Sequence, residues 1–179
     1  MTQPASLTNT LPIRHATIDD LNAIVAVTNR AFICEQSLVI GDRTDAADIS
    51  QRFAIGNFYV IDDAANRARL RGSVFCSIEH SRGYLGLLSV DPDAQGQGYS
   101  YRLVAAVEDH CRKAGCRFLD ITVVNLRSEL FPFYAKLGFT AFDVIPFPVP
   151  ALARQPLRLV KMTKPLVAPP QMRTTTKLL

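Results

Sequence analysis

A glycine-spaced loop at residues 95–100 is the stretch of this 179-residue chain whose residue types best fit a chemical task. It follows an apolar run that ends at Val90 and a turn that contains Pro92, and it leads directly into a pattern with helical spacing. A loop of this kind directs several backbone N–H groups and the positive end of a helix toward one point. The stretch therefore predicts an anion site, and a phosphate is the anion that suits it best.

Two common phosphate loops match this stretch poorly. A dinucleotide fingerprint G-x-G-x-x-G that starts at Gly96 requires a glycine where the chain has Tyr101. Asp120 lies about 20 residues further on, roughly where a ribose-binding acid belongs, but the missing third glycine outweighs this agreement. A Walker loop requires Gly-Lys-Ser/Thr, which the sequence lacks. A nicotinamide-binding domain therefore stays only a distant alternative.

The elements on either side of the loop predict how it is held. Three short strands joined by polar turns are expected before it, at residues 58–61, 72–79 and 84–90. An amphipathic helix follows the loop and ends before Gly115, and residues 118–124 form a nearly continuous apolar strand. A strand, a loop, a helix and a strand in succession make a β-α-β unit, whose two strands run parallel.

The remaining chain adds strands and helices around this unit. Strands are expected at residues 13–16, 139–145 and 157–162, and helices after Thr17, over residues 46–53 and around Tyr134. These elements predict a mixed α/β fold with a central, mostly antiparallel sheet of about seven strands and helices on both faces. A single domain is expected over residues 13–164, with a loose arm at residues 1–12 and a disordered tail at residues 165–179.

Two separate motifs resemble the GNAT superfamily of N-acetyltransferases. The acetyl-CoA loop of that family has Gln or Arg, two residues, Gly, one residue, and then Gly or Ala, and here Gln95, Gly98 and Ser100 occupy the three defined positions. Further on, Asn125 and the run Phe133-Tyr134-Ala135-Lys136-Leu137-Gly138-Phe139 resemble the asparagine and the Y-x-K-L-G-F signature of the family. Ser100 departs from Gly/Ala but is small.

The resemblance implies a coenzyme site with defined roles. Backbone N–H groups of the loop would hold the pyrophosphate of acetyl-CoA, and the backbone of the preceding strand, which carries a bulge in the family, would pair with pantetheine. An N–H near Val90 would stabilise the oxyanion, Asn125 would contact the pantetheine arm, and Tyr134 would protonate the departing thiolate. The expected coenzyme-binding residues are Leu88, Ser89, Val90, Gln95, Gly96, Gln97, Gly98, Tyr99, Ser100 and Asn125. Tyr134 could instead be a core aromatic residue, and Asn125 a strand-ending cap.

The general base is the open part of the expected site. The strand at residues 84–90 contains no carboxylate, so Glu79 at the end of the preceding strand is the first candidate, with His80 beside it and Asp143 after them. A solvated charge at a strand end is the plain alternative for Glu79. By analogy with the family, Glu35 and Asp42 fall where an acceptor pocket would be shaped and could recognise a cationic amine.

The expected activity is transfer of an acetyl group from acetyl-CoA to a primary amine of a small molecule, by direct attack in a ternary complex. A catalytically silent acyl-CoA-binding module of the same fold is the alternative, because no base is evident. Nucleic acid and membranes are not expected as partners, since the net charge of +4 is mild and scattered and no apolar segment is long enough to span a bilayer. The four cysteines form no metal motif, so no metal site is expected and a cytoplasmic protein is favoured. A homodimer is left open.

Overall fold

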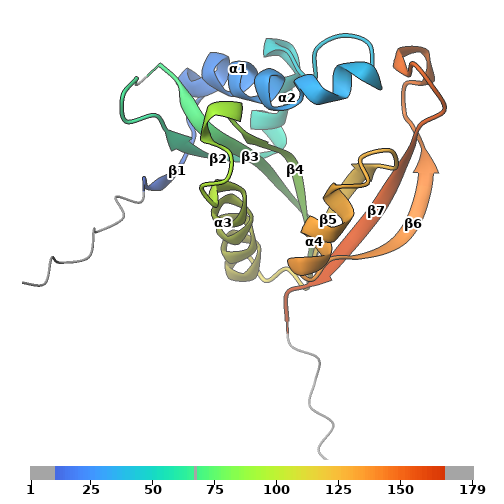
Figure 1. Ribbon diagram of the computed structural model, residues 1–179. Helices are drawn as coiled ribbons and strands as arrows, with labels where there is room; N and C mark the ends of the chain where they lie inside the picture. The colour runs from blue at the N-terminus through green and yellow to red at the C-terminus, as the bar shows by residue number, and fades with distance from the viewer. Residues whose placement is uncertain (1–10, 67, 168–179) are drawn as a thin grey trace, which may run out of the picture.

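A seven-stranded sheet runs through the computed structural model, which describes residues 11–66 and 68–167 (Figure 1). The strands lie in the order β1-β2-β3-β4-β5-β7-β6. Each neighbouring pair is antiparallel except β4 and β5, which are parallel. The predicted sheet and its parallel unit are thus confirmed. The strand bounds are β1 (Ile13–His15), β2 (Gly56–Asp62), β3 (Leu70–Glu79), β4 (Arg82–Val90), β5 (Phe118–Val124), β6 (Thr140–Pro146) and β7 (Arg158–Pro165).

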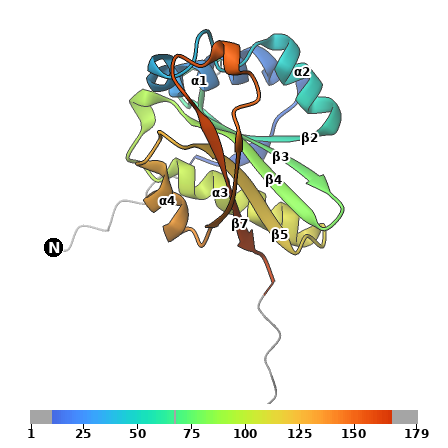
Figure 2. The same cartoon turned by 90° about the vertical axis from the view of Figure 1, so that its right-hand side faces the viewer.

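Helices cover both faces of the sheet, as Figures 1 and 2 show. On one face lie α1 (Leu21–Ala31) and α2 (Ala46–Ile55). On the other lie α3 (Tyr99–Lys113), which connects β4 to β5, and the short α4 (Leu130–Lys136). The segment between α1 and α2 contains a 3-10 turn at Ile33–Ser37.

Each face of the sheet has its own hydrophobic core. The first core joins the buried stripe of α3 to the sheet and to Tyr134 and Phe139 beside α4. The second joins α1 and α2 to the sheet around Phe58, Phe75 and Leu87. Because β4 contributes side chains to both cores, its backbone is held from both faces where it approaches the loop at residues 95–100.

The ordered sheet reaches slightly beyond the expected domain boundary at Lys164. Strand β7 includes Pro165, and the buried Leu166 donates its backbone N–H to the Arg117 carbonyl at 2.9 Å. The other residues of the expected tail fall outside the described residues, apart from Val167. The same holds for residues 1–10 of the expected arm, whereas Leu11 packs against the first core. Within the described part, no helix is both long and apolar enough to cross a membrane.

Gly56, at the start of β2, provides a test of the close contact between β2 and β3. A Cβ atom at this position would lie 2.3 Å from the Cys76 carbonyl oxygen and 2.8 Å from the Phe75 ring. Because backbone and a buried ring cannot easily move aside, we expect Gly56→Ala to lower the free energy of unfolding by about 1–3 kcal/mol, measured by urea denaturation.

The control for Gly56→Ala is Ser50→Ala, at an exposed position on α2. It should leave the free energy of unfolding within about 0.5 kcal/mol of the wild type. Equal stability of Gly56→Ala and the wild type would show that the two strands do not approach as closely as the structure indicates.

Candidate active site

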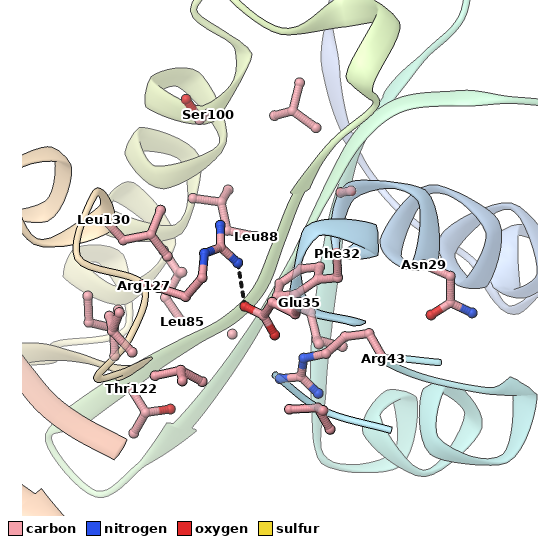
Figure 3. A pocket seen from close by; sticks show the side chains of 18 of the residues that line it. Asn29, Phe32, Glu35, Arg43, Leu85, Leu88, Ser100, Thr122, Arg127 and Leu130 are labelled. Carbon is pink, nitrogen blue, oxygen red and sulfur yellow. Dashed lines mark hydrogen bonds and ion pairs between the residues drawn. The ribbon is translucent and has the colours of Figure 1, made fainter. Parts of the chain in front are cut away.

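Strands β4 and β5 separate after a short parallel contact. They pair only from Arg82 with Phe118 to Tyr84 with Asp120, whereas β5 continues along β7 as far as Val124. From Leu85 onward, the edge of β4 that faces β5 has no strand partner. A pocket of about 580 Å³ opens in this region, lined by both strands and by the loops around them (Figure 3).

A β-bulge in β4 lies at the same place. Gly86 pairs with Phe75 and Ser89 with Ser73, so that two residues of β4 stand opposite one residue of β3. Leu87 is the residue that absorbs the extra length, with φ of 48°, a left-handed conformation that non-glycine residues rarely adopt. A bulge twists and re-aims a strand. The structure therefore places the irregularity just before the expected coenzyme-contacting residues of this strand.

The three β4 residues expected to contact the coenzyme point in different directions. Leu88 and Val90 line the pocket. Ser89 is fully buried, and its Oγ donates to the Leu87 carbonyl at 2.9 Å and to Thr28 at 3.4 Å. Ser89 can therefore offer the pocket only its backbone.

The glycine-spaced loop leads into the N-terminus of α3 without an acidic residue in the first turn and without a side-chain cap. Gly96 and Gly98 both have φ of 76°, and the space where a Cβ would stand is open at both. The first backbone N–H groups of α3 and its dipole therefore face an uncrowded surface that favours an anion. Gln97 is exposed and does not line the pocket, unlike the rest of the loop, namely Gln95, Gly96, Gly98, Tyr99 and Ser100.

Asp91 anchors the entry to this loop. Its carboxylate is buried and accepts hydrogen bonds from Arg30 on α1 at 3.1 Å and from Arg69 before β3 at 3.0 Å. It also accepts the backbone N–H of Asp93 at 3.0 Å, and the exposed Asp93 carboxylate contacts the same two arginines. Burial works against the charge of Asp91, but these partners outweigh it and lower the pKa of the carboxyl below its usual value.

Tyr134 on α4 lines the pocket and is 8% exposed. Its ring packs against Phe133 and Phe139 with centroid distances of 5.0 and 5.7 Å. Burial, assisted by nearby Tyr84, raises the pKa of the Tyr134 hydroxyl to about 12. This hydroxyl is therefore protonated at neutral pH and can act as a proton donor, while its ring also serves packing.

Asn125 forms hydrogen bonds with the backbone of the neighbouring chain segment in the sheet. Its Oδ1 accepts the backbone N–H of Arg158 at 2.8 Å, and its own N–H donates to the Arg158 carbonyl at 3.0 Å. These bonds continue the β5–β7 ladder by one residue, and Asn125 is not among the residues that line the pocket. The arrangement fits the strand-ending role, and a contact with the coenzyme stays a prediction.

None of the three candidate bases of the sequence analysis lines the pocket. Glu79 and His80 form the tight hairpin between β3 and β4, where their side chains are 90% and 89% exposed. This hairpin is at the opposite end of β4 from Val90, because Glu79 pairs with Arg82. Asp143 on β6 is exposed and pairs with Lys161 at 3.5 Å. Glu79 thus has the surroundings of a solvated strand-end charge.

Glu35 and Asp42, from the segment between α1 and α2, both line the pocket. Glu35 is buried, and its Oε1 accepts a hydrogen bond from Arg127 Nη1 at 2.5 Å (Figure 3). Arg127 follows β5 and also contacts Glu129. The sequence gives no indication of this pair, because its members lie 92 positions apart and Arg127 belongs to no recognisable motif.

A second contact across the splayed strands was also not foreseen. The Tyr84 hydroxyl on β4 and the Thr122 hydroxyl on β5 lie 3.0 Å apart where the strands begin to separate, and both residues line the pocket.

The described residues contain no group of three or more His, Cys, Asp or Glu side chains that could hold a metal ion.

The fold is shared with solved N-acetyltransferases, and the sequence comparison identifies the family. Residues 32–139 match the acetyltransferase (GNAT) family. The chain belongs to this family, as its two motifs indicated.

Three individual proteins illustrate the similarity. A mycothiol acetyltransferase from Actinosynnema mirum is 31% identical over 124 residues, which make up 68% of this chain and 41% of that protein. The chain thus spans less than half the length of this curated relative. The ribosomal-protein-S18-alanine N-acetyltransferase from Escherichia coli has a TM-score of 0.71 and 16% identity, covering 90% of this chain and 97% of its own. The yncA protein from Salmonella typhimurium, solved with its cofactor acetyl-CoA, has a TM-score of 0.67 and 19% identity, covering 90% and 98%.

The burial of Asp91 generates a pH prediction. The pKa of Asp91 is lower in the folded state than in the unfolded state, where it is near 3.8. The interactions of its charged carboxylate therefore stabilise the fold at pH values above 3.8, and this contribution is lost as the pH falls through the folded-state pKa. We expect Asp91→Asn to lower the free energy of unfolding by about 1–3 kcal/mol at pH 7, and the difference from the wild type to shrink below about pH 4.

Asp93→Asn is the matched control for Asp91→Asn, because Asp93 contacts the same two arginines but its side chain is 64% exposed. Denaturation of both variants between pH 3 and pH 7 makes the comparison, and Asp93→Asn should cost less than about 1 kcal/mol. Similar losses for the two variants at every pH would contradict the anchoring role of Asp91.

Proposed function

We propose that the protein is an N-acetyltransferase that moves an acetyl group from acetyl-CoA to a primary amine of a small molecule, by direct attack in a ternary complex. One observation carries the proposal: the unpaired edge of β4, the start of α3 and the buried Tyr134 all line one pocket. In the proposed reaction they would serve as a row of backbone hydrogen-bonding groups, an anion site and a proton donor.

The residues of this pocket fit acetyl-CoA. The open glycine loop and the first N–H groups of α3 would bind the pyrophosphate, and no acidic side chain in that turn opposes it. Backbone groups of β4 between Leu85 and Val90 would pair with the amides of the pantetheine arm, as an added strand would. Acetyl-CoA supplies the activated acyl group as a thioester.

The chemistry needs a bond to form between the amine nitrogen and the acyl carbon while the carbon–sulfur bond breaks. A backbone N–H of β4 near Val90 would stabilise the negative charge that develops on the carbonyl oxygen. The Tyr134 hydroxyl, held protonated by burial, would give its proton to the departing thiolate, and the proton that the amine nitrogen loses would return to Tyr134 through water. A transfer through cysteine is unfavourable, because Cys76, Cys111 and Cys116 are buried in the core and the exposed Cys34 does not line the pocket.

Support for a small-molecule acceptor comes from the relative named as a mycothiol acetyltransferase. The structurally similar Escherichia coli enzyme is named for a protein alanine, so the fold by itself does not distinguish acceptors. One observation favours the alternative of a catalytically silent acyl-CoA-binding module: Glu79, His80 and Asp143, the three expected bases, are all exposed and outside the pocket lining.

Two measurements test the proposal in sequence. Calorimetric titration with acetyl-CoA and with NADH separates the ligand classes, and we expect binding of acetyl-CoA alone. A thiol-release assay over a panel of primary amines then separates an enzyme from a binding module. Tight binding of NADH would refute the family-based assignment of the loop, and acetyl-CoA binding without turnover of any amine would favour the module.

Tyr134→Phe tests the proton donor. The variant removes one hydroxyl and keeps the ring that packs against Phe133 and Phe139. We expect kcat to fall by about ten- to a thousandfold, the range for one proton-transfer group, while the Kd for acetyl-CoA stays nearly unchanged. In the wild type, kcat should not decline near pH 10 through this group, because its pKa is raised to about 12. Unchanged turnover of the variant would remove Tyr134 from the chemistry.

Gly98→Val tests the loop, and Gly115→Val is its matched control. Both glycines have nearly the same left-handed φ, 76° and 79°, and an open Cβ position, but they flank opposite ends of α3. Backbone strain should therefore be similar in both variants. We expect only Gly98→Val to lose acetyl-CoA binding, by calorimetry, because its side chain would obstruct the pyrophosphate. Equal affinities in the two variants would refute the loop assignment.

A further inference from the structure

Two opposite charges face the end of the pocket that lies away from α3 and do not pair with each other. Glu35 comes from the 3-10 turn Ile33–Ser37 and Arg43 from the stretch before α2, and both line the pocket. In Figure 3 their side chains extend toward the same space, and Ser100 of the coenzyme loop lies at the far side of the view, beyond Arg127. No ion pair joins Glu35 and Arg43.

The guanidinium of Arg43 is available to a ligand. It lies over the ring of Phe32, with its central carbon 5.2 Å from the ring centroid, and it makes no ion pair with a carboxylate in the described part of the chain. Nearby Arg52 and Arg127, by contrast, are each held by a carboxylate. The stacking on Phe32 leaves the N–H donors at the rim of the guanidinium plane to bind an anion.

Only one oxygen of the Glu35 carboxylate accepts a hydrogen bond within the described part of the chain. Its Oε1 accepts from Arg127, whereas Oε2 accepts no hydrogen bond from the described residues. With 8% of the residue exposed, the free oxygen belongs to a sheltered site and can accept an N–H of an amine. The lining near these charges is mixed: Phe32, Val39 and Ile40 supply apolar surface, and Asp42 adds a second carboxylate beside Arg43.

We propose that the acceptor carries a carboxylate beside its primary amine, as an α-amino acid does, with the amine oriented by Glu35 and the carboxylate bound by Arg43. This inference rests on the proposed acetyltransferase function. Charge complementarity supports it, because an acceptor with both groups can contact the free oxygen of Glu35 and the exposed guanidinium of Arg43 together, whereas a simple amine can use only Glu35. The apolar part of the lining would then receive the side chain of the acceptor.

Matched acceptors test the inference directly. The thiol-release assay compares L-phenylalanine, L-phenylalaninamide and 2-phenylethylamine, and in parallel L-leucine, L-leucinamide and 3-methylbutylamine. We expect kcat/KM for the amino acid to exceed that for its amide and its decarboxylated amine by about tenfold or more, as for a charge-assisted hydrogen bond. The amide has the less basic amine, so its larger fraction of free amine acts against the expected preference.

Arg43→Ala identifies the residue responsible. It should lower kcat/KM for the amino acid by about 10- to 100-fold and change the values for the amide and for acetyl-CoA by less than about threefold. Arg43→Lys should restore part of the loss. Lys113→Ala is the control, because it removes one positive charge from the exposed end of α3, away from the residues that line the pocket.

The outcomes separate the inference from the function on which it rests. Similar turnover of all three compounds in each set, or an equal effect of Arg43→Ala on all of them, overturns the inference and leaves the acetyltransferase intact. Failure to bind acetyl-CoA overturns the function, and the inference with it. If acetyl-CoA binds without turnover, calorimetry of the same compounds with CoA-loaded protein decides: selective binding of the amino acids that Arg43→Ala abolishes supports the inference, and any other result overturns it.

Discussion

The separation of β4 from β5 is the constraint on which the rest of the site depends. Three residue pairs hold the strands together, and beyond Tyr84 and Asp120 each strand is supported from its other side, β4 by β3 and β5 by β7. An unpaired strand edge inside a sheet leaves backbone donors and acceptors to be satisfied, which makes it a template for a ligand with amide groups. The bulge at Leu87 and the two separate cores keep this edge in place without closing the gap.

The rigidity of the coenzyme end follows from electrostatics as much as from the backbone. Asp91 is attached to α1 through Arg30 and to the start of β3 through Arg69, so the turn that leads into α3 is fixed both to the helix on the opposite face and to the sheet itself. A buried carboxylate is costly unless it is paired, and here two guanidinium groups and a backbone N–H satisfy it. The loop that follows can therefore present its N–H groups in one arrangement without a ligand to organise it.

The sequence was informative where structure is local and uninformative where it depends on distant segments. Residues 118–124 form β5 as predicted, and the glycine loop follows β4 and leads into α3. Both features could be predicted because hydrophobic spacing and glycine positions are properties of neighbouring residues in the sequence. Glu79 is a candidate base by its place near β4 in the sequence, whereas the tight hairpin holds it at the end of that strand opposite Val90. The pair Glu35–Arg127 could not be foreseen, since neither residue carries a local signal for the other.

The two halves of the pocket differ in the same way, because one is built from neighbouring residues and the other from distant segments. The half that we propose binds the coenzyme is built mainly by one continuous stretch, from β4 through the first turn of α3. The proposed acceptor half combines the α1–α2 segment, Arg127 after β5 and the loop between β6 and β7. The buried pair Glu35–Arg127 spans these parts, and such pairs contribute little net stability because desolvation offsets their attraction. Its effect is geometric: it ties the segment after α1 to the segment after β5 across the pocket. In the proposed function, this tie would hold the acceptor half in place independently of the stretch that binds the coenzyme.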